Sequence, residues 1–573
     1  MPDAVERRRN LVVAAAIFLL ALAIRLLHLR EVALHDPYYA LPTVDDLQYD
    51  AWARRLAAGE GLIDGVLYLG PGYPIFMAGI YAIFGPSLAA VKGVQAVLGA
   101  GACVLAWGVA RALFDARAAA IAGLFAAFHA MLVFYGGTIM TVNLKVPLVL
   151  GLVWVLLRTL RRPTFGGFAA SGALLGMAVL VQQTALPFLP FMLLWILFGW
   201  RGTPALGRRA AFAATFAAAT LAFILPITLH NLRSGDDFVL LNSMGGPNFY
   251  MGNRRGADGT WQVPDLGFRI RADNPDEMQR QFKAAAERAS GRKLKPSQVS
   301  AYWMARGIDE IRADPGRWLR LELRKLGLHW NAYEVWNIRS FEISQASSWI
   351  LRLPLLTLGV LAPLGLLGVL LSLPRWRELV PLHGIVLVYL AGSLLFFVLA
   401  RYRLPGLVVL IPFAGFAVVR LGEVLRTRDL RGLALAAAAL ALLAFVVHLP
   451  LESSEGRMHM AWYNLANKYR ELERWDEAIA AYQKSLAEVP GAISTHNNLA
   501  LAYELGGRRD EAIRAWRHVL ELARRQRDAT RIERAERHIE ALAAAEAAEA
   551  GKTGETGPTG PAEGAGAAGP GPE

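Results

Sequence analysis

Long apolar runs separated by short polar connections dominate the chain up to about residue 450. Eleven stretches of about 20 mostly apolar residues can be marked, which is the length that a helix needs to cross a bilayer. They begin near residues 11, 87, 117, 141, 166, 185, 210, 350, 380, 405 and 431. The pattern predicts eleven membrane-spanning helices. A shorter apolar stretch at residues 72–84 is predicted to lie in the membrane interface or to re-enter the membrane.

The connections between these runs carry different charges on the two sides. With a cytoplasmic N-terminus, every cytoplasmic connection has at least two arginines; these are residues 111–117, "RTLRRPT", "RGTPALGRR", "PRWREL" and "RTRDLRG". The short outer connections carry no Lys or Arg apart from Lys145 at a span entrance. Basic loops stay on the cytoplasmic side of membrane proteins. We therefore predict long outer segments at residues 30–86 and 229–349 and, because the span count is odd, an extracytoplasmic region from about residue 452.

The first apolar run raises the question of whether it is a removable signal. It follows "ERRRN", which resembles the basic start of a signal peptide, but no small-residue cleavage site follows it. Many further spans come after it. We expect an uncleaved first helix.

Composition agrees with a membrane protein and changes how the net charge is interpreted. The 573 residues are 55% hydrophobic and 19% charged, with a formal net charge of +13. A positive balance can indicate nucleic-acid binding, but here the arginines of the cytoplasmic loops explain it. No nucleic acid is expected as a partner. The one cysteine, Cys103, lies inside an apolar run, so no internal disulfide or thiolate metal cluster is expected.

Two stretches near the C-terminus repeat at a spacing of 34 residues, "NLANKYRELERWDEAIAAYQKSL" and "NLALAYELGGRRDEAIRAWRHVL". Their leucine, tyrosine and alanine positions align in the tetratricopeptide pattern. Small Ala478 and Ala512 stand where paired helices approach closely. We predict an α-solenoid of tetratricopeptide repeats over residues 452–549, ending in a capping helix. The Gly/Pro-rich residues 550–573 are predicted to be disordered.

Two adjacent carboxylates, Asp45 and Asp46, follow the first span in "PTVDDLQYDAWARRLAAGEG". One interpretation makes Thr43 a helix N-cap with Asp46 as its acidic partner, which is a purely structural role. A cap needs only one carboxylate, however, and two adjacent ones repel each other unless a cation or a substrate offsets the repulsion. The second carboxylate therefore points to a functional site near the start of this helix, which also carries Tyr49.

Further polar candidates lie on the predicted outer side. The stretch "ARYRLPG" places Arg401 and Arg403 at a span boundary, where arginines either extend to the surface or bind an anion such as a lipid phosphate. The loop "SMGGPNFYMGN" gathers aromatic and amide side chains that can contact a sugar. An amphipathic helix over residues 313–337 leads to a glutamate. The lower-ranked candidates for a cavity wall are Tyr49, Asn248, Tyr250, Asn253 and Glu334.

These motifs, in this order and on one side, resemble the GT-C membrane glycosyltransferases over about residues 10–450. The resemblance is to the group that includes protein O-mannosyltransferases and the aminoarabinose transferase of lipid A. It is carried by "DDLQYDAWARRLAAGEG", "GPGYPIFMAGIYAIFG", "HNLRSGDDFVLLNSMGGPNFYMGN" and "RYRLP". The acidic pair here is Asp-Asp, where the family often has Asp-Glu. No second acidic metal motif is evident, which leaves a divalent cation as an open question and no other cofactor expected.

The resemblance implies a transferase that moves a sugar from a polyprenyl-phosphate donor to an extracytoplasmic hydroxyl, with inversion at the anomeric carbon. Asp45 or Asp46 would take the acceptor proton, and Arg401 or Arg403 would contact the leaving phosphate. We therefore predict an all-α, polytopic GT-C-like domain over residues 1–451, in contact with membrane lipids of a bacterial-type inner membrane. The repeats are expected to bind a protein acceptor or an assembly partner.

Two other functions stay open at this point. A non-enzymatic membrane scaffold would use the repeats alone and would not need the acidic pair. A transporter of lipid-linked sugars would favour broken helices in two related halves, and the sequence shows no such internal symmetry.

Overall fold

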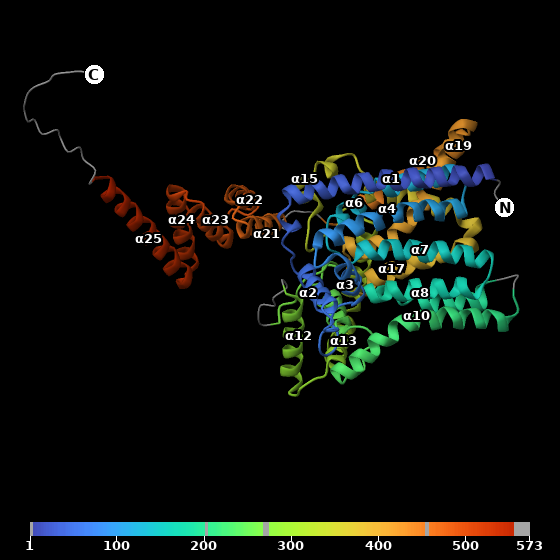
Figure 1. The fold of residues 1–573 in the computed structure, drawn as a ribbon, viewed down its shortest axis with the longest axis horizontal. Coiled ribbons are helices and arrows are strands. Elements are labelled where there is room, and N and C mark those ends of the chain that lie inside the picture. Colours follow the sequence, from blue (N-terminus) through green and yellow to red (C-terminus); the bar gives the residue numbers. More distant parts are fainter. Residues whose placement is uncertain (1–3, 201–203, 267–273, 453–457, 555–573) are drawn as a thin grey trace, which may run out of the picture. The chain divides into compact units, whose positions relative to one another are not determined.

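The computed structural model of the chain is almost entirely helical. It describes residues 4–200, 204–266, 274–452 and 458–554, among which no β-sheet forms. The chain divides into two compact units, Met1–Ser453 and Ser454–Glu573. Figure 1 labels their helices. The predicted all-α class is confirmed, with apolar helices in the first unit and repeats in the second.

Each of the eleven predicted runs is helical. By length and composition, seven helical segments in the described part of the chain could cross a membrane, and shorter apolar helices occur at Ala116–Ala127, Phe165–Val181 and Gln183–Gly199. Two of the seven, Leu358–Leu395 and Ala400–Thr427, each contain two of the α-helices. The helices are α1 (Ala4–His35), α4 (Leu88–Leu113), α5 (Ala116–Ala127), α7 (Val142–Arg161), α8 (Phe165–Val181), α9 (Phe188–Leu194), α10 (Leu206–Gly235), α16 (Leu358–Ser372), α17 (Val380–Leu395), α18 (Ala400–Leu407), α19 (Ile411–Thr427) and α20 (Leu430–Val447).

The start of one span differs from the prediction. The span expected from residue 350 begins at Leu358, because the residues before it form α15 (Phe341–Ser347) and the 3-10 helix Trp349–Arg352. Ile350 and Leu351 are buried within the unit. These apolar residues pack inside the unit, and in the sequence they extend the apolar run that begins the span, so the predicted start is too early.

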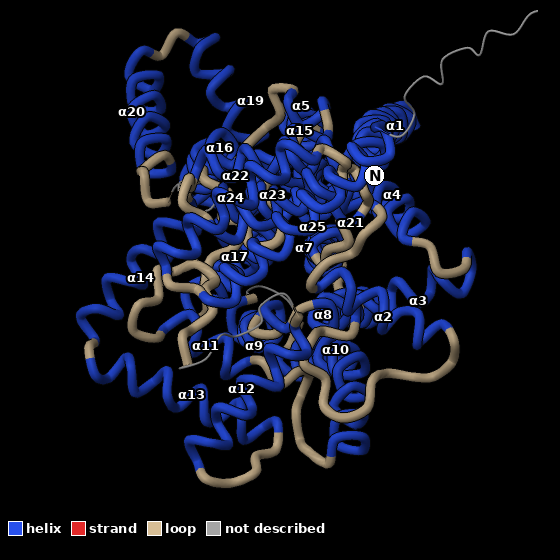
Figure 2. Tube along the Cα trace, turned by 90° about the vertical axis from the view of Figure 1, so that its left-hand side faces the viewer, coloured by secondary structure: helices blue, strands red, loops and turns tan. Residues whose placement is uncertain are grey.

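The two long polar segments fold into shorter helices. The first forms α2 (Asp45–Ala57) and α3 (Gly72–Phe84), and the second forms α11 (Gly245–Asn253), α12 (Pro275–Ser290), α13 (Pro296–Ala313) and α14 (Pro315–Trp330). Figure 1 shows α2, α12 and α13 at the end of the bundle opposite the N-terminus, and Figure 2, which looks onto that end, shows α2 to the right of α12 and α13. The α3 helix packs on α2, and the ring centres of Tyr49 and Tyr73 lie 5.1 Å apart.

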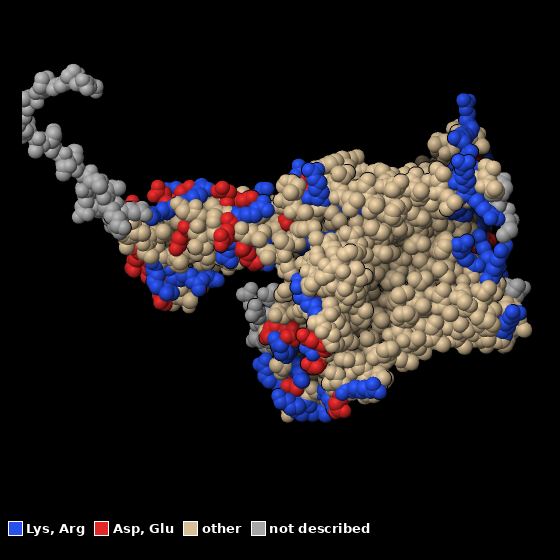
Figure 3. Space-filling view, viewed as in Figure 1, with Lys and Arg blue, Asp and Glu red and all other residues tan. Residues whose placement is uncertain are grey.

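Charged side chains gather at the two ends of the first unit, with a broad uncharged band between them (Figure 3). Lys and Arg predominate at the end that holds the start of α1 and the turn between α19 and α20. At the other end, around α12 and α13, both signs are mixed. This distribution has the form that the positive-inside rule describes for a membrane protein.

The second unit consists of paired helices, α21 (Met458–Glu471), α22 (Trp475–Glu488), α23 (Ile493–Leu505) and α24 (Arg509–Gln526), followed by α25 (Ala529–Gly554). Ala478 and Ala512 are fully buried, as the repeat pattern requires, and so are the aromatic residues Tyr482 and Trp516. The α25 helix continues past residue 550, into the stretch predicted to be disordered. Residues 555–573 lie outside the described residues.

Close packing of α8 on α10 depends on glycine. A Cβ atom added to Gly172 would lie 2.3 Å from the carbonyl oxygen of Phe216, which real structures do not allow. The Thr220 hydroxyl also donates a hydrogen bond to the Gly172 carbonyl oxygen at 3.1 Å. The two helix backbones therefore approach as glycine-containing membrane helices do.

We expect Gly172→Ala to lower the free energy of unfolding by about 1–3 kcal/mol, because the methyl group must push α10 away. The measurement is the thermal unfolding temperature of the purified protein in detergent. Gly166→Ala in the same helix is the matched control, because nothing lies within 4 Å of its added Cβ. Equal unfolding temperatures for the two variants would contradict this account of the α8–α10 contact.

Candidate active site

The first aspartate of the acidic pair meets the distant arginine at the edge of the bundle. Asp45 is the first residue of α2, and Arg401 lies at the start of α18. Arg401 Nη1 donates a hydrogen bond to Asp45 Oδ2 at 2.7 Å, between residues 356 positions apart in the chain. The Asp45 and Arg401 side chains are 14% and 8% exposed. This contact thus joins α2, in the first outer segment, to α18, which begins the late span Ala400–Thr427.

Asp46 faces a different arginine. Its side chain is 1% exposed, and its Oδ2 lies 3.5 Å from Nη2 of Arg339. The other terminal nitrogen of Arg339 lies 3.5 Å from Asp36. Burial raises the pKa of Asp46 from 3.8 to about 7, against the opposing effect of Arg339 and with a smaller contribution from the charge of Asp45. One carboxylate of the pair therefore titrates near neutral pH.

The interpretation of Thr43 and Asp46 as a helix cap is wrong. The N-cap of α2 is Val44, and no side chain caps the helix. The Thr43 hydroxyl has no hydrogen-bond partner among the described residues. Val44 has φ 49° and ψ −114°, a conformation that is rare for a β-branched residue. Such backbone strain persists only where the surroundings hold it and is common at functional sites.

Two buried lysines that the sequence analysis did not select lie in this region. The Lys145 side chain on α7 is 0% exposed, donates a hydrogen bond to Gln182 and lies 5.8 Å from the centre of the Tyr402 ring. The Arg401 guanidinium lies 4.9 Å from the centre of the same ring. Lys92 on α4 is 1% exposed and donates a hydrogen bond to the carbonyl oxygen of Tyr39 at 2.8 Å. The signal for Lys145 was its place as the one basic residue in the short outer connections.

Two basic side chains lie beside the Tyr402 ring. Arg401 and Lys145 both approach this ring, and Asp45 supplies a carboxylate to Arg401. No ion pair joins Lys145 to a carboxylate within the described ranges. Buried basic groups are costly to charge unless an anion compensates them. This group of residues therefore suits the binding of an anion.

Arg403 has a structural role. It is fully buried, and its terminal nitrogens donate five hydrogen bonds, to the carbonyl oxygens of Leu328, His329, Asn331 and Tyr333 and to the carboxylate of Glu334. These acceptors occupy both terminal nitrogens of the guanidinium. Arg403 thus fixes the turn that follows α14, with Glu334 as its partner at 2.9 Å. Of the two arginines predicted to contact phosphate, Arg401 is the one that lies beside the acidic pair.

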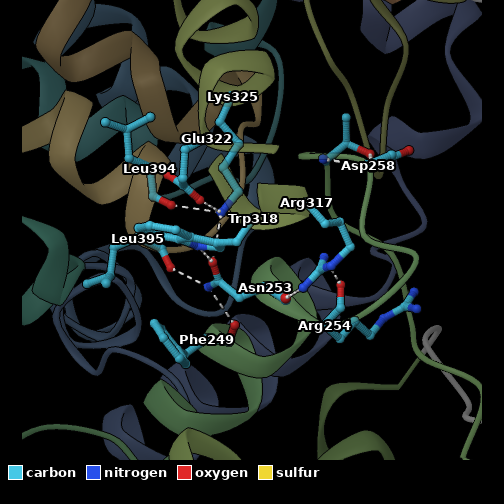
Figure 4. A network of polar contacts seen from close by, with 11 residues as sticks. Phe249, Asn253, Arg254, Asp258, Arg317, Trp318, Glu322, Lys325, Leu394 and Leu395 are labelled. Atoms are coloured by element: carbon cyan, nitrogen blue, oxygen red, sulfur yellow. Dashed lines mark hydrogen bonds and ion pairs between the residues drawn. The ribbon is translucent and has the colours of Figure 1, made fainter. Parts of the chain in front are cut away.

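Asn253 belongs to another polar network, which joins α11, α14 and the end of α17 (Figure 4). Its amide nitrogen donates to the carbonyl oxygens of Phe249 and Leu395, both at 2.9 Å. Its side-chain oxygen accepts hydrogen bonds from Trp318 at 3.0 Å and from Lys325 at 3.2 Å. Both ends of the Asn253 amide are thus hydrogen-bonded within the protein, and the side chain connects α11 to the end of α17.

The loop between α17 and α18 carries Arg401 to its place. The amide of Val398 donates to the Gly259 carbonyl oxygen, and the amide of Ala400 donates to that of Val335, both at 2.8 Å. Both acceptors belong to the second outer segment. That segment therefore holds the backbone from which Arg401 extends.

The remaining candidates divide between two places. Tyr49 lies one turn beyond Asp45 and is buried, and this burial, with the nearby Asp45 charge, raises its pKa well above the usual value. Asn248 and Tyr250 lie on α11, where the Tyr250 ring centre is 4.8 Å from that of Trp303 on α13. Tyr49 thus lies with the acidic pair, whereas no hydrogen bond in the described part of the chain links Asn248 or Tyr250 to that pair.

The acidic pair does not form a cluster of metal ligands with its neighbours in this structure. In the described ranges, no group of three or more His, Cys, Asp or Glu side chains could hold a metal ion. Asp45 and Asp46 contact different arginines, so their carboxylates do not converge on one point. No step of the chemistry is therefore assigned to a metal.

Comparison with protein families identifies parts of both units. Residues 69–230 match the family described as dolichyl-phosphate-mannose-protein mannosyltransferase. Residues 459–491 and 495–530 match tetratricopeptide repeats. The resemblance to this GT-C group and the predicted repeats are confirmed. A comparison with curated proteins gives no match.

Solved structures of two proteins are similar to this chain. The archaeal oligosaccharyltransferase AglB from Archaeoglobus fulgidus, in complex with an inhibitory peptide and a dolichol-phosphate, is 15% identical, with a TM-score of 0.41 over 83% of this chain and 60% of that chain. ArnT from Cupriavidus metallidurans, bound to undecaprenyl phosphate, is 16% identical, with a TM-score of 0.33 over 74% of this chain and 80% of that chain. The present chain thus spans 60% of the length of the oligosaccharyltransferase.

The raised pKa of Asp46 predicts how stability depends on pH. Between the unfolded value of 3.8 and the folded value of about 7, the folded protein binds more protons, so its stability falls as the pH rises through this window. Asp46→Asn removes this titration, which is worth about 1.4 kcal/mol for each unit of pKa shift. We expect the unfolding temperature of this variant to change less between about pH 5 and about pH 8 than that of the wild type.

Asp64→Asn is the control for this measurement, because the Asp64 side chain is 91% exposed. It should leave the pH dependence of the wild type unchanged. An Asp46→Asn variant with the same pH dependence as the wild type would show that Asp46 does not titrate in this range.

Proposed function

We propose that this chain is an integral membrane glycosyltransferase that moves a sugar from a polyprenyl-phosphate donor to a hydroxyl acceptor on the extracytoplasmic face. The 2.7 Å contact between Asp45 and Arg401 carries the proposal, because it places a carboxylate beside a buried cation at the start of the apolar segment Ala400–Thr427. The family match over residues 69–230 supports the same class of reaction.

The proposed reaction replaces one bond at the anomeric carbon with another. The acceptor oxygen attacks opposite the phosphate, the bond to the phosphate oxygen breaks, and the polyprenyl phosphate leaves with the electron pair. The configuration therefore inverts. The acceptor proton passes to a carboxylate. Asp45 is the better placed of the pair, because its side chain is 14% exposed and that of Asp46 is 1% exposed.

The leaving phosphate gains negative charge as the bond breaks, and cations placed in advance stabilise that charge. Arg401 supplies a planar guanidinium that can hold two phosphate oxygens, and Lys145 supplies a compact point charge. Asp46 is the buried neighbour of Asp45. Its pKa of about 7 determines whether it is charged, and Arg339 compensates that charge. Arg403 and Glu334 support the loop beside this site.

The second unit is proposed to bind a protein, either the acceptor or an assembly partner, because stacked helix pairs present a continuous surface to peptides. The proposed location is the inner membrane of a bacterial-type cell, with the N-terminus in the cytoplasm and the repeats outside. The arginine-rich end of the first unit supports this orientation.

Transfer of labelled sugar tests the proposed reaction directly. Purified protein is incubated with a panel of undecaprenyl-phosphate sugars and a cell-envelope extract as the acceptor source. We expect transfer, with a rate lowered by about 10²–10⁴-fold in Asp45→Asn, because the proton acceptor is lost. Arg401→Gln and Lys145→Met should also slow the reaction, and Asp64→Asn should not.

The rival functions give different results in this assay. A scaffold would transfer no sugar, and a transporter would move the lipid-linked sugar across a vesicle membrane without transferring it. A wild-type transfer rate in the Asp45→Asn, Asp46→Asn double variant would contradict the assigned role of the acidic pair.

Membrane orientation has its own test. Glu60→Cys in the first outer segment and Leu505→Cys in the repeats are each expected to react with a membrane-impermeant maleimide in intact spheroplasts. Native Cys103 is fully buried and serves as the unreactive background. Labelling at only one of the two positions would contradict the odd span count.

A further inference from the structure

Arg401 already has an anionic partner in this structure. Its Nη1 donates to Asp45 Oδ2 at 2.7 Å and also contacts the sulfur of Met140 at 3.3 Å. Its Nη2 reaches only the neutral hydroxyl of Tyr402, at 3.3 Å. Its Nε has no hydrogen-bond partner among the described residues. Asp45 therefore accepts the shortest hydrogen bond of the Arg401 guanidinium, and the Nε of this guanidinium is left without an acceptor among the described residues.

A phosphate and Asp45 would compete for this guanidinium. Its donors form a rigid planar fork, and two anions bound side by side on it would repel each other. Lys145 lies near the same Tyr402 ring as Arg401, with an amide as its hydrogen-bond partner. A phosphate that replaced the carboxylate would therefore face two cations, whereas Asp45 pairs with one.

We propose that Asp45 is the counter-ion that the donor phosphate displaces from Arg401, so that the donor binds first and its binding releases the base. This inference rests on the proposed function and adds an order of events to it. While Oδ2 accepts the Arg401 hydrogen bond, the Asp45 carboxylate is held at Arg401. Exchange of Arg401 from carboxylate to phosphate frees Asp45 at the moment when the sugar is in place.

The neighbouring aspartate is not exchangeable in the same way. Asp46 is 1% exposed and pairs with Arg339, which also pairs with Asp36 and donates to the carbonyl oxygen of Tyr38 at 3.0 Å. Displacing Asp46 would leave a buried carboxylate without its cation. The two aspartates thus offer a matched comparison at a pH above about 7, where Asp46 is ionised, because Arg401 contacts Asp45 and Arg339 contacts Asp46.

The test is equilibrium binding of undecaprenyl phosphate to the full-length protein in detergent, with undecaprenol as the ligand that lacks phosphate. Asp45→Asn is expected to bind undecaprenyl phosphate roughly tenfold more tightly than the wild type, because the competing charged hydrogen bond is gone. Asp46→Asn should bind like the wild type, and so should Asp45→Glu, which keeps the carboxylate. Affinity for undecaprenol should be the same in all four proteins.

Each outcome separates this inference from the proposed function. Binding by the wild type without a gain in Asp45→Asn overturns the inference and leaves the transferase standing. Equal gains in Asp45→Asn and Asp46→Asn would assign the effect to net charge and overturn it as well. A wild type that binds undecaprenyl phosphate no better than undecaprenol contradicts both. Asp45→Ser replaces Asp45→Asn if the latter does not fold, as judged by its unfolding temperature.

Discussion

Pairing of buried charges at the end of the bundle that holds α2 is the constraint on which the first unit depends. An isolated buried ion costs several kcal/mol, so each must meet a partner when the chain folds. The partners come from three separate places: the first outer segment supplies Asp45 and Asp46, the second supplies Arg339 and Glu334, and a late span supplies Arg401 and Arg403. Satisfying these pairs brings together segments that the apolar pattern alone does not align.

The second outer segment consequently belongs to the site. Its turn at residues 328–334 surrounds the Arg403 guanidinium, and its Gly259 and Val335 hold the loop that ends at Ala400. The Asn253 network attaches the same segment to the end of α17. Arg401 is thus positioned by backbone hydrogen bonds from a part of the chain that contributes none of the proposed reacting groups.

The lengths of the apolar runs predicted the helices, and the charges of the loops predicted which segments lie on the same side, because the bilayer governs both patterns. The same rule put Asp45 and Arg401 on one side of the membrane, whereas their contact at 2.7 Å comes from the fold. The role of Arg403 was out of reach, because its acceptors are backbone carbonyls about 70 residues away, which no side-chain pattern reveals. The local sequence pattern predicts Thr43 as a cap, whereas the start of α2 is held by the contacts of Asp45 and Asp46 with distant arginines.

The strained turn at Val44 has a mechanical consequence. Asp45 and Asp46 are successive residues of one helical turn, so their separation is fixed, yet they are bonded to arginines from different segments. The first turn of α2, which follows the strained Val44, is therefore anchored at two points, to the late span through Arg401 and to the second outer segment through Arg339.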